Sequence, residues 1–209
     1  MTFVIYSLIF GVIAYILGSI PSAVWIGKTF HNIDVREHGS KNAGATNTFR
    51  ILGKKAGIIV LLMDVFKGII AVFIPKLILK ELSYEIEIQL QLISGICVFL
   101  GHLFPLFAQF RGGKGVATSL GIIIGIHPPA AGICFLIFLI VFISSKYVSL
   151  GAIVASFFFP LIVFFIFKET SIYLIVFSNV IGITVILTHK KNILRIIHGE
   201  ENKMNLFKR

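Results

Sequence analysis

The sequence predicts an all-α integral membrane protein, a compact bundle of about seven transmembrane helices made of five full spans and two short ones. Its N-terminus is expected outside the cell and its C-terminus in the cytoplasm. Apolar residues make up 57% of the 209 residues and charged residues only 13%, and the mean hydropathy is +0.98, unlike soluble globular domains. The apolar residues form long runs, and Lys and Arg gather in alternate loops. These observations together predict the fold class.

The predicted helices occupy, in chain order, residues 3–27, 56–79, 88–108, 116–126, 130–143, 147–167 and 171–188. The first three, the sixth and the seventh approach the length of about 20 residues that a full span needs, whereas the fourth and fifth are short. The two short runs flank His127-Pro128-Pro129 and are compatible with two tilted spans or with one re-entrant hairpin. Both arrangements leave the later loops on the same sides, so five and seven crossings remain alternatives.

Basic residues predict which loops face the cytoplasm. They lie in the first loop (Lys28, Arg36, Lys41, Arg50, Lys54, Lys55), the third (Arg111, Lys114), the fifth (Lys146) and the tail (Lys190, Lys191, Arg195, Lys203, Lys208, Arg209). The opposite loops contain Glu81, Glu85, Glu87 and Glu169 against Lys76, Lys80 and Lys168. This asymmetry orients the chain by the positive-inside rule. The first apolar run has no preceding positive charge and no small-residue cleavage site, so we interpret it as a retained span.

The net charge of +10 follows mostly from this bias, because the basic residues lie beside the membrane spans. The chain has no room for a soluble nucleic-acid-binding domain, so nucleic acid is not expected as a partner. Cys97 and Cys134 stand singly in apolar runs, without metal-binding spacing, and are interpreted as packing residues. The sequence therefore predicts one membrane-embedded domain over residues 1–209, with membrane lipid around it and no obligatory protein partner.

The first polar cluster covers residues 39–50, GSKNAGATNTFR. Its small residues with hydroxyl and amide groups favour turns that expose backbone donors, which suits an acyl carbonyl or a phosphate. The candidate residues of this loop are Ser40, Asn42, Gly44, Thr46 and Asn47. The alternative is a plain connection whose following helix is capped by Thr46 or Asn47. Arg50 is a candidate phosphate ligand, or an arginine that reaches the lipid headgroups.

The second cluster combines residues 101–105, GHLFP, with residues 110–118, FRGGKGVAT. It does not match a nucleotide-binding P-loop, because Ala108 and Gly115 stand where glycine and Ser or Thr are required. A simpler anion site remains, in which Lys114 supplies charge and a helix starts at Val116. The glycines Gly112, Gly113 and Gly115 would allow close approach of the backbone. The alternatives are a flexible turn and, for His102, a structural histidine.

The third cluster joins Ser149 near the fifth loop with His189, Asn192 and Glu201 in the tail. His189 and Asn192 are three residues apart at a helix end, so both side chains can face one side and polarise a hydroxyl. The alternative, a basic patch attracted to anionic lipid, explains the lysines and arginines of this segment but gives His189 and Asn192 no purpose. In the second span, Asp64 and Lys67 are spaced to form an ion pair, either as interior structural contacts or as part of the site.

These residues resemble the acyl-phosphate:glycerol-3-phosphate acyltransferases of bacterial membranes, the PlsY type, over essentially the whole chain. The motifs that carry the resemblance are Gly39-Ser40, Asn42, Gly44-Ala45-Thr46-Asn47 and Arg50; Gly101-His102, Pro105 and 112–118; His189, Asn192, Glu201 and Lys203; and the segments 64–68 and 149–153. Lys41 and Ala43 depart from the family, where glycine and proline are commoner, and put the loop shape in question.

The resemblance implies a multi-pass enzyme of the bacterial cytoplasmic membrane with its active site on the cytoplasmic side. It would transfer a fatty acyl group from acyl phosphate to glycerol 3-phosphate, giving lysophosphatidic acid and inorganic phosphate as the first step of phospholipid synthesis. Ser40, Lys114, His189 and Asn192 would be catalytic. Arg50, Lys114 and the second-cluster glycines would bind substrate phosphate. Asp64, Lys67, His102, Ser149 and Glu201 would support the site, and neither a cofactor nor a metal is implied.

An activated acyl phosphate can be attacked directly by the glycerol hydroxyl, so no covalent enzyme intermediate is required. Backbone N–H groups of the first two loops would stabilise the oxyanion. The proton acceptor is His189 or the phosphate of the substrate itself. The rival interpretation, a transporter for a phosphorylated solute, requires polar residues along a path across the bilayer. The predicted spans are overwhelmingly Ile, Leu, Val and Phe, which favours the enzyme.

Overall fold

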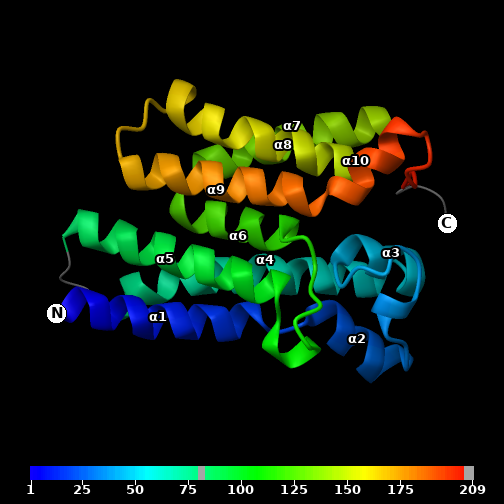
Figure 1. Cartoon of the computed structure of the whole chain (residues 1–209), viewed down its shortest axis with the longest axis horizontal. Helices are drawn as coiled ribbons and strands as arrows, with labels where there is room; N and C mark the ends of the chain where they lie inside the picture. Colours follow the sequence, from blue (N-terminus) through cyan, green and yellow to red (C-terminus); the bar gives the residue numbers. More distant parts are fainter. Residues whose placement is uncertain (80–82, 205–209) are drawn as a thin grey trace. The chain divides into compact units, whose positions relative to one another are not determined.

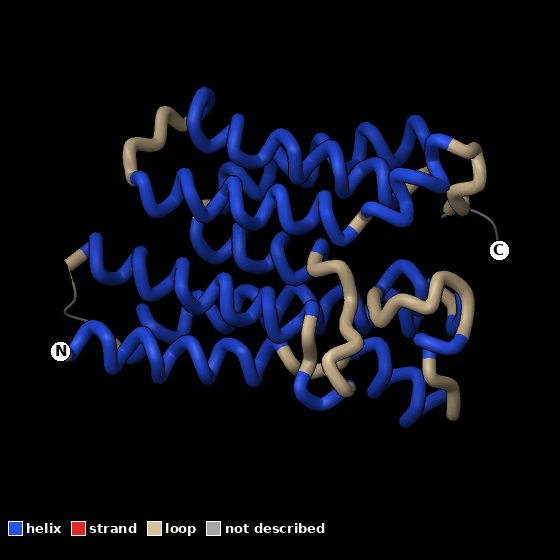
Figure 2. Tube along the Cα trace, in the orientation of Figure 1, coloured by secondary structure: helices blue, strands red, loops and turns tan. Residues whose placement is uncertain are grey.

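The computed structural model describes residues 1–79 and 83–204, and every regular element in those two ranges is helical (Figure 1, Figure 2). The prediction of an all-α chain is confirmed. Four residues that entered the charge argument, Lys80, Glu81, Lys208 and Arg209, lie outside the described ranges. The contacts divide the chain into two compact units, Met1–His127 and Pro128–Arg209. A single domain over residues 1–209 stays a prediction.

Unit 1 contains the helices that carry the first two polar clusters. Its elements are α1 (Thr2–Gly18), α2 (Ser22–His31), the 3-10 turn η1 (Val35–Glu37), α3 (Ala45–Leu52), α4 (Lys54–Ile78), α5 (Tyr84–Leu103), the 3-10 turn η2 (Leu106–Ala108) and α6 (Val116–Ile126). Helix α1 packs along α5, and α4 packs along α6 and α5. The predicted run 3–27 is therefore interrupted between α1 and α2.

Glycines let the unit 1 helices approach closely. A Cβ at Gly18 would overlap the backbone of Val98 on α5, and one at Gly101 would overlap the carbonyl of Tyr15 on α1. Between α4 and α6, a Cβ at Gly121 would overlap the backbone of Val65. Small residues at such crossings are the usual way in which apolar helices pack where lipid removes the hydrophobic driving force. These contacts set the packing of α1 on α5 and of α4 on α6, the helices from which the site is built.

Unit 2 contains α7 (Pro128–Ser145), α8 (Val148–Leu161), the π-helical turn η3 (Ile162–Ile166), α9 (Ile172–Thr188) and α10 (Lys190–Ile197). Helix α8 packs against both α7 and α9. The π turn starts two residues after Pro160, a residue that cannot donate to the helical hydrogen-bond ladder. The tail returns to the loop between α7 and α8, where the Met204 N–H donates to the Lys146 carbonyl at 2.9 Å. Two loops predicted on the same side therefore lie together within this unit.

Within the described residues, five helical segments are long and apolar enough to cross a membrane: Thr2–His31, Lys54–Ile78, Tyr84–Ala108, Pro128–Ser145 and Val148–Ile166. The prediction that segment 130–143 is short is wrong, because α7 starts at the prolines and extends to 18 residues; proline is favoured in a first helical turn. Helix α6 is short as expected, with 11 residues. Helix α9 has 17 residues and is followed by α10 at a bend of 55°. Seven crossings and the outside N-terminus stay predictions.

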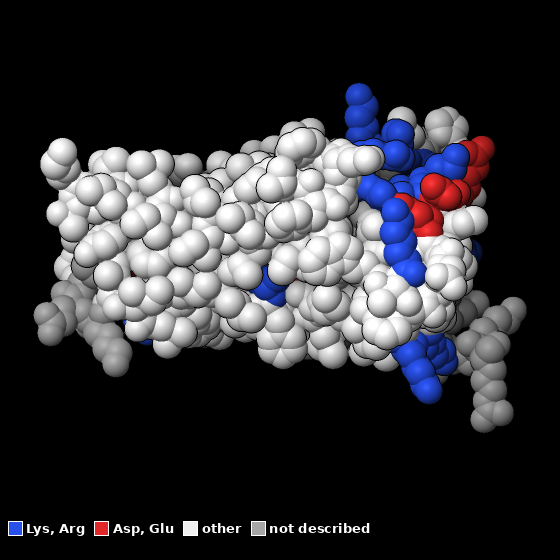
Figure 3. All heavy atoms as spheres, turned by 90° about the horizontal axis from the view of Figure 1, so that it is seen from below, with Lys and Arg blue, Asp and Glu red and all other residues white. Residues whose placement is uncertain are grey.

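The surface of α1 suits contact with lipid. Its outward side chains are almost all branched aliphatic residues, including Val4, Leu8 and Val12, each more than half exposed. Figure 3 shows this face nearly free of charged residues along α1, with Lys and Arg gathered toward the end where α2 lies. Exposed apolar surface on this scale marks contact with a membrane rather than with water.

Candidate functional site

The first polar cluster is organised around the buried side chain of Asn47. Its Nδ2 amide donates to the carbonyls of Val35 at 2.7 Å, His38 at 3.1 Å and Asn42 at 3.1 Å. Its Oδ1 accepts the backbone N–H of Ser40 at 2.9 Å. One buried side chain therefore contacts four backbone groups of the turn η1 and of the irregular loop that follows it. Asn47 positions Ser40 without itself presenting a free amide.

The alternative in which Thr46 or Asn47 caps the following helix is wrong. Helix α3 begins at Ala45, its N-cap is Gly44, and no side chain caps it. Thr46 and Arg50 are four residues apart within α3, so both lie on one side of it. Lys41, one of the two departures from the family pattern, adopts φ +57°, the left-handed conformation that favours glycine. The loop takes this shape although a lysine stands there.

The glycine turn of the second cluster lies against the end of α5. The Gly112 N–H donates to the Leu103 carbonyl and the Gly113 N–H to the His102 carbonyl, each at 3.2 Å. These two N–H groups therefore already donate hydrogen bonds within the protein. Phosphate binding at the two glycines stays a prediction, and it would require other donors. Gly115 has φ +84° and is the N-cap of α6, which starts at Val116 as predicted.

The two loops are joined by a pair of charged residues that the sequence reasoning did not select. Arg36 Nη1 donates to the Ala108 carbonyl at 2.8 Å, while Nε and Nη2 bind the Asp34 carboxylate at 2.9 and 2.7 Å. These hydrogen bonds from Arg36 hold the pKa of Asp34 well below its usual range. In the sequence, only the two-residue spacing of Asp34 and Arg36 could have indicated this contact. The acceptor at Ala108 is a backbone atom 72 residues away and leaves no pattern.

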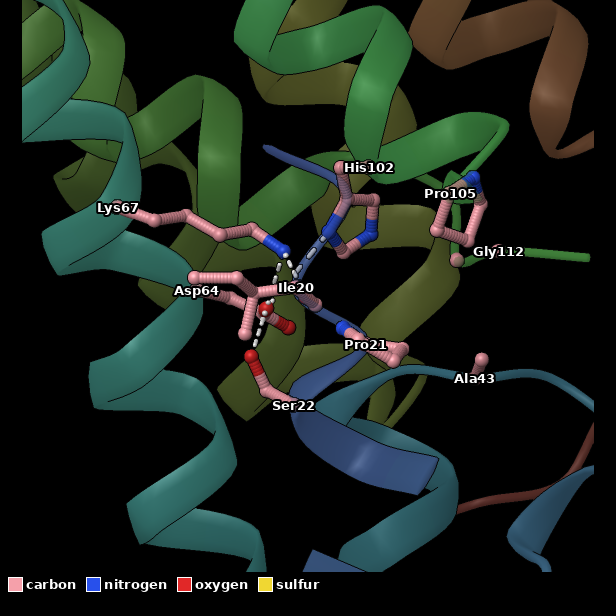
Figure 4. Close-up of a pocket in the computed structure, with 10 residues that line it drawn as sticks. Ile20, Pro21, Ser22, Ala43, Asp64, Lys67, His102, Pro105 and Gly112 are labelled. Atoms are coloured by element: carbon pink, nitrogen blue, oxygen red, sulfur yellow. Dashed lines mark hydrogen bonds and ion pairs between the residues drawn. The ribbon is translucent and has the colours of Figure 1, made fainter. Parts of the chain in front are cut away.

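A buried polar cluster lies beneath these loops, where α4 passes the break between α1 and α2. Lys67 Nζ contacts Asp64 Oδ1 at 2.9 Å and donates to the Gly18 and Ile20 carbonyls at 3.1 Å each. The Ser22 hydroxyl also donates to Asp64 Oδ1, at 2.9 Å. The predicted ion pair is confirmed, and all three ammonium donors of Lys67 have protein acceptors. Figure 4 shows both side chains of α4 pointing toward Ser22 and His102.

His102 extends this cluster toward the glycine turn. Its Nδ1 lies 3.0 Å from Thr118 Oγ1 and 3.7 Å from Asp64 Oδ1. A cavity of about 10 Å³ is lined by residues of both loops and of the buried cluster: Ile20, Pro21, Ser22, Ala43, Asp64, Lys67, His102, Pro105, Gly112 and Gly113 (Figure 4). This is about the smallest volume that can hold one water molecule. The cavity is too small for a substrate phosphate, but it shows that the two loops meet over the ion pair.

In unit 2, Glu201 is the centre of the third cluster. Its Oε1 accepts hydrogen bonds from Ser149 Oγ at 2.8 Å and Asn192 Nδ2 at 2.7 Å. Its Oε2 accepts from Arg195 Nε at 2.8 Å. The carboxylate thereby joins the tail to α8 and α10 and fixes the orientation of the Asn192 amide. The sequence marks Arg195 only as one of several basic residues in the tail, because its carboxylate partner lies beyond the end of the helix.

His189 occupies the bend between α9 and α10 and is 3% exposed. Its Nδ1 lies 2.7 Å from the Val185 carbonyl. Because a carbonyl only accepts hydrogen bonds, Nδ1 carries a proton, and in the neutral ring Nε2 is the basic nitrogen. The contact with the Val185 carbonyl therefore fits the neutral tautomer that has its proton on Nδ1.

The Glu201 cluster predicts a pH dependence of stability. Burial pushes the pKa of Glu201 upward, but the hydrogen bonds from Asn192, Ser149 and Arg195 outweigh it and leave the pKa below its usual value. The cluster should therefore stabilise the protein fully above the ordinary glutamate pKa of about 4.3 and lose this effect as the pH falls through the lowered folded-state pKa. Thermal unfolding of Glu201→Gln should show a deficit near neutral pH that shrinks in acid. The exposed Glu200→Gln variant is the control, and an equal deficit at every pH would contradict the prediction.

Each unit brings together part of the predicted site. In unit 1 the structure joins the loops that carry Ser40, Asn42, Gly44, Asn47, Gly112 and Gly113 with His102, Asp64 and Lys67. Arg50 and Lys114 are half-buried on the same two segments. In unit 2 it joins Ser149, Asn192 and Glu201, with His189 one helical turn before Asn192. Ser22 and Thr118, the partners of Asp64 and His102, had no signal that pointed to those contacts.

The chain is similar to proteins of one enzyme family throughout its length. The family model described as glycerol-3-phosphate acyltransferase matches residues 8–199. The glycerol-3-phosphate acyltransferase of Fusobacterium nucleatum is 45% identical over 194 residues, covering 93% of this chain and 96% of that protein. The enzyme of the same name from Listeria welshimeri is 43% identical over 197 residues, with coverage of 94% and 96%.

Two crystal structures of PlsY, an integral membrane glycerol 3-phosphate acyltransferase, have the same fold. Its glycerol 3-phosphate form is 35% identical, with a TM-score of 0.86 and coverage of 97% of this chain and 99% of that one. Its lysophosphatidic acid form is 34% identical, with a TM-score of 0.82 and coverage of 95% of each chain. At this identity and coverage the likeness extends beyond the fold alone.

Proposed function

The chain belongs to the glycerol-3-phosphate acyltransferase family and is a multi-pass membrane enzyme, and from this premise we propose that acyl phosphate is its donor. The fatty acyl group passes to glycerol 3-phosphate, giving lysophosphatidic acid and inorganic phosphate. A crystallised relative is described in a glycerol 3-phosphate form and a lysophosphatidic acid form, which supports this acceptor and product for the present chain. The active site faces the cytoplasm of a bacterial cell.

The main support for the proposal is that the first and second polar clusters, which contain Arg50 and Lys114, are joined in unit 1 at the ends of apolar helices. Arg36 binds the Ala108 carbonyl, and Ala43 and Gly113 line the same small cavity. This joining of the two segments supports the assignment of Arg50 on α3 and Lys114 before α6 to one polar surface at the ends of apolar helices. Such a surface suits a donor with an apolar chain and a charged head that meets a water-soluble phosphate.

Arg50 and Lys114 bind the phosphates of the two substrates in this proposal. The guanidinium of Arg50 suits bidentate binding, whereas Lys114 supplies a compact charge beside the N-terminus of α6. Ser40, oriented through its N–H by Asn47, and the backbone around it face the reacting carbonyl. Catalysis then rests on positioning and on stabilisation of the oxyanion.

The glycerol hydroxyl attacks the acyl carbonyl carbon, the carbon–oxygen bond to phosphate breaks, and the hydroxyl proton leaves with a base. Phosphate departs as an anion without a covalent enzyme intermediate. The base is His189 or the phosphate of the substrate. The protonated Nδ1 of His189 supports the first choice, because Nε2 is then the nitrogen that accepts the proton.

Purified protein tests the proposal directly. Incubated in detergent micelles with acyl phosphate and glycerol 3-phosphate, it should release inorganic phosphate and lysophosphatidic acid in equal amounts. Parallel reactions with an acyl thioester donor should give much less product. Product formed only from the thioester would reject acyl phosphate as the donor, and binding of glycerol 3-phosphate without any product would favour the transporter.

Lys114→Ala should weaken the binding of glycerol 3-phosphate by about 1.5–3 kcal/mol, the usual loss for one charge-assisted hydrogen bond. The Michaelis constant for glycerol 3-phosphate should therefore rise roughly tenfold to a hundredfold, with a smaller effect on the constant for acyl phosphate. Lys55→Ala, which removes an exposed lysine at the start of α4, is the matched control. Equal Michaelis constants for the two variants would remove Lys114 from the phosphate site.

A further inference from the structure

We propose that His102 is a positioning residue that holds the segment from Gly113 to Thr118, and with it Lys114, in place for the acceptor phosphate. The inference rests on the proposed function, because its main readout is the binding of glycerol 3-phosphate. It concerns a side chain at the end of α5 that acts through the turn and does not itself contact substrate.

Side chains of α4 and α6 hold the His102 ring in its orientation. It is 6% exposed, and its Nδ1 lies 3.0 Å from Thr118 Oγ1 and 3.7 Å from Asp64 Oδ1. Asp64 is held by Lys67 and Ser22, and Lys67 is anchored on the carbonyls at the break between α1 and α2. Four helices of unit 1 thus contribute to the orientation of one imidazole ring. A ring with this many partners has little freedom to rotate.

The glycine turn packs directly against the same ring. A Cβ at Gly113 would overlap His102 Nε2 and come close to His102 Cε1 and to the Ala43 carbonyl oxygen. Gly113 does not have a positive φ, unlike Gly115, so its backbone conformation is open to any residue. The closest overlap is with the imidazole, which is therefore the main obstacle to a side chain at position 113. The glycine is there because the turn lies directly on the ring.

His102 consequently holds both ends of a short segment. Gly113 rests on the Nε2 side of the ring and also donates its N–H to the His102 carbonyl at 3.2 Å, and Thr118 on α6 contacts Nδ1. Lys114, Gly115 and the start of α6 lie between these two points. Movement of the ring would shift the charge and the helix N-terminus together, and displacements of about 1 Å at such positions can cost a hundredfold in rate.

The test is a double-variant cycle in the full-length protein. Gly113→Ala introduces a methyl group that the ring excludes, and His102→Ala removes the ring. Each should raise the Michaelis constant for glycerol 3-phosphate by about tenfold or more, with a smaller change in kcat. The double variant should regain much of the loss relative to Gly113→Ala, because the new methyl group then fills space that the ring has left. Recovery of this kind is the signature of two residues in direct contact.

Gly112→Ala provides the matched control. A Cβ at Gly112 would overlap the backbone carbonyls of His102 and Leu103, and these remain when the imidazole is removed. His102→Ala should therefore not rescue Gly112→Ala. Thermal unfolding of all variants, measured beside the kinetics, separates a shifted turn from a destabilised fold.

Suppose that the wild type is active but the Michaelis constant of the double variant rises by the product of the two single-variant increases. The inference is then overturned, while the proposed function stands. Variants that lose thermal stability but keep the wild-type Michaelis constant overturn it as well, because the ring would then be structural only. A wild type that forms no product from acyl phosphate and glycerol 3-phosphate rejects the proposed function, and this inference fails with it.

Discussion

Lys67→Met should lower the free energy of unfolding by about 3–5 kcal/mol, the typical cost of removing one partner from a buried ion pair. The Asp64 carboxylate would remain 2% exposed without its cation, and the Gly18 and Ile20 carbonyls would lose their ammonium donor. Methionine nearly matches the length of the lysine chain, so the effect comes from the charge. Chemical unfolding in detergent, followed by helical circular dichroism, measures it.

Lys76→Met is the control on the same helix. Lys76 is 54% exposed and pairs with Glu87 at 3.0 Å, and exposed pairs contribute about 0–1 kcal/mol. Combining Lys67→Met with Asp64→Leu should recover stability relative to Lys67→Met alone, because no buried charge then lacks a partner. If Lys67→Met unfolds like Lys76→Met, the buried cluster does not stabilise the break between α1 and α2.

Asn47→Asp should reduce kcat/KM by a hundredfold or more, as expected when a catalytic loop loses its geometry. The substitution keeps the shape of the side chain but replaces its donor amide by a carboxylate oxygen, which would face the carbonyls of Val35, His38 and Asn42. Repulsion among these oxygens opens the loop that orients Ser40. Steady-state assays with both substrates varied measure the change.

Asn32→Asp makes the same chemical change at an exposed position, the C-cap of α2, and should leave kcat/KM close to that of the wild type. Asparagine and aspartate both tolerate the left-handed conformation found there, with φ 52°. Comparable activity of the Asn47 and Asn32 variants would mean that the first loop keeps its shape without the Asn47 amide.

Local sequence patterns anticipated much of the architecture. The apolar runs marked the helices, the three-residue spacing of Asp64 and Lys67 predicted their ion pair, and the glycine turn predicted the start of α6 at Val116. The errors were local as well. The N-cap of α3 is Gly44, and no side chain caps the helix. The prolines that were expected to precede a helix form the first turn of a longer α7. Capping residues and prolines are each compatible with more than one starting residue for a helix.

The amino-acid sequence by itself determined the helical membrane class, the alternation of charged loops and the family motifs, because these depend on composition and on residues near one another in the chain. Only the tertiary structure decided which distant groups meet. Arg36 with the Ala108 carbonyl, Ser149 with Glu201, and the His102 ring with Thr118 and Gly113 are such pairs. Their partners are set by how closely the helices pack at glycines and by where each helix ends, and a hydrogen bond made there has no periodic pattern in the sequence.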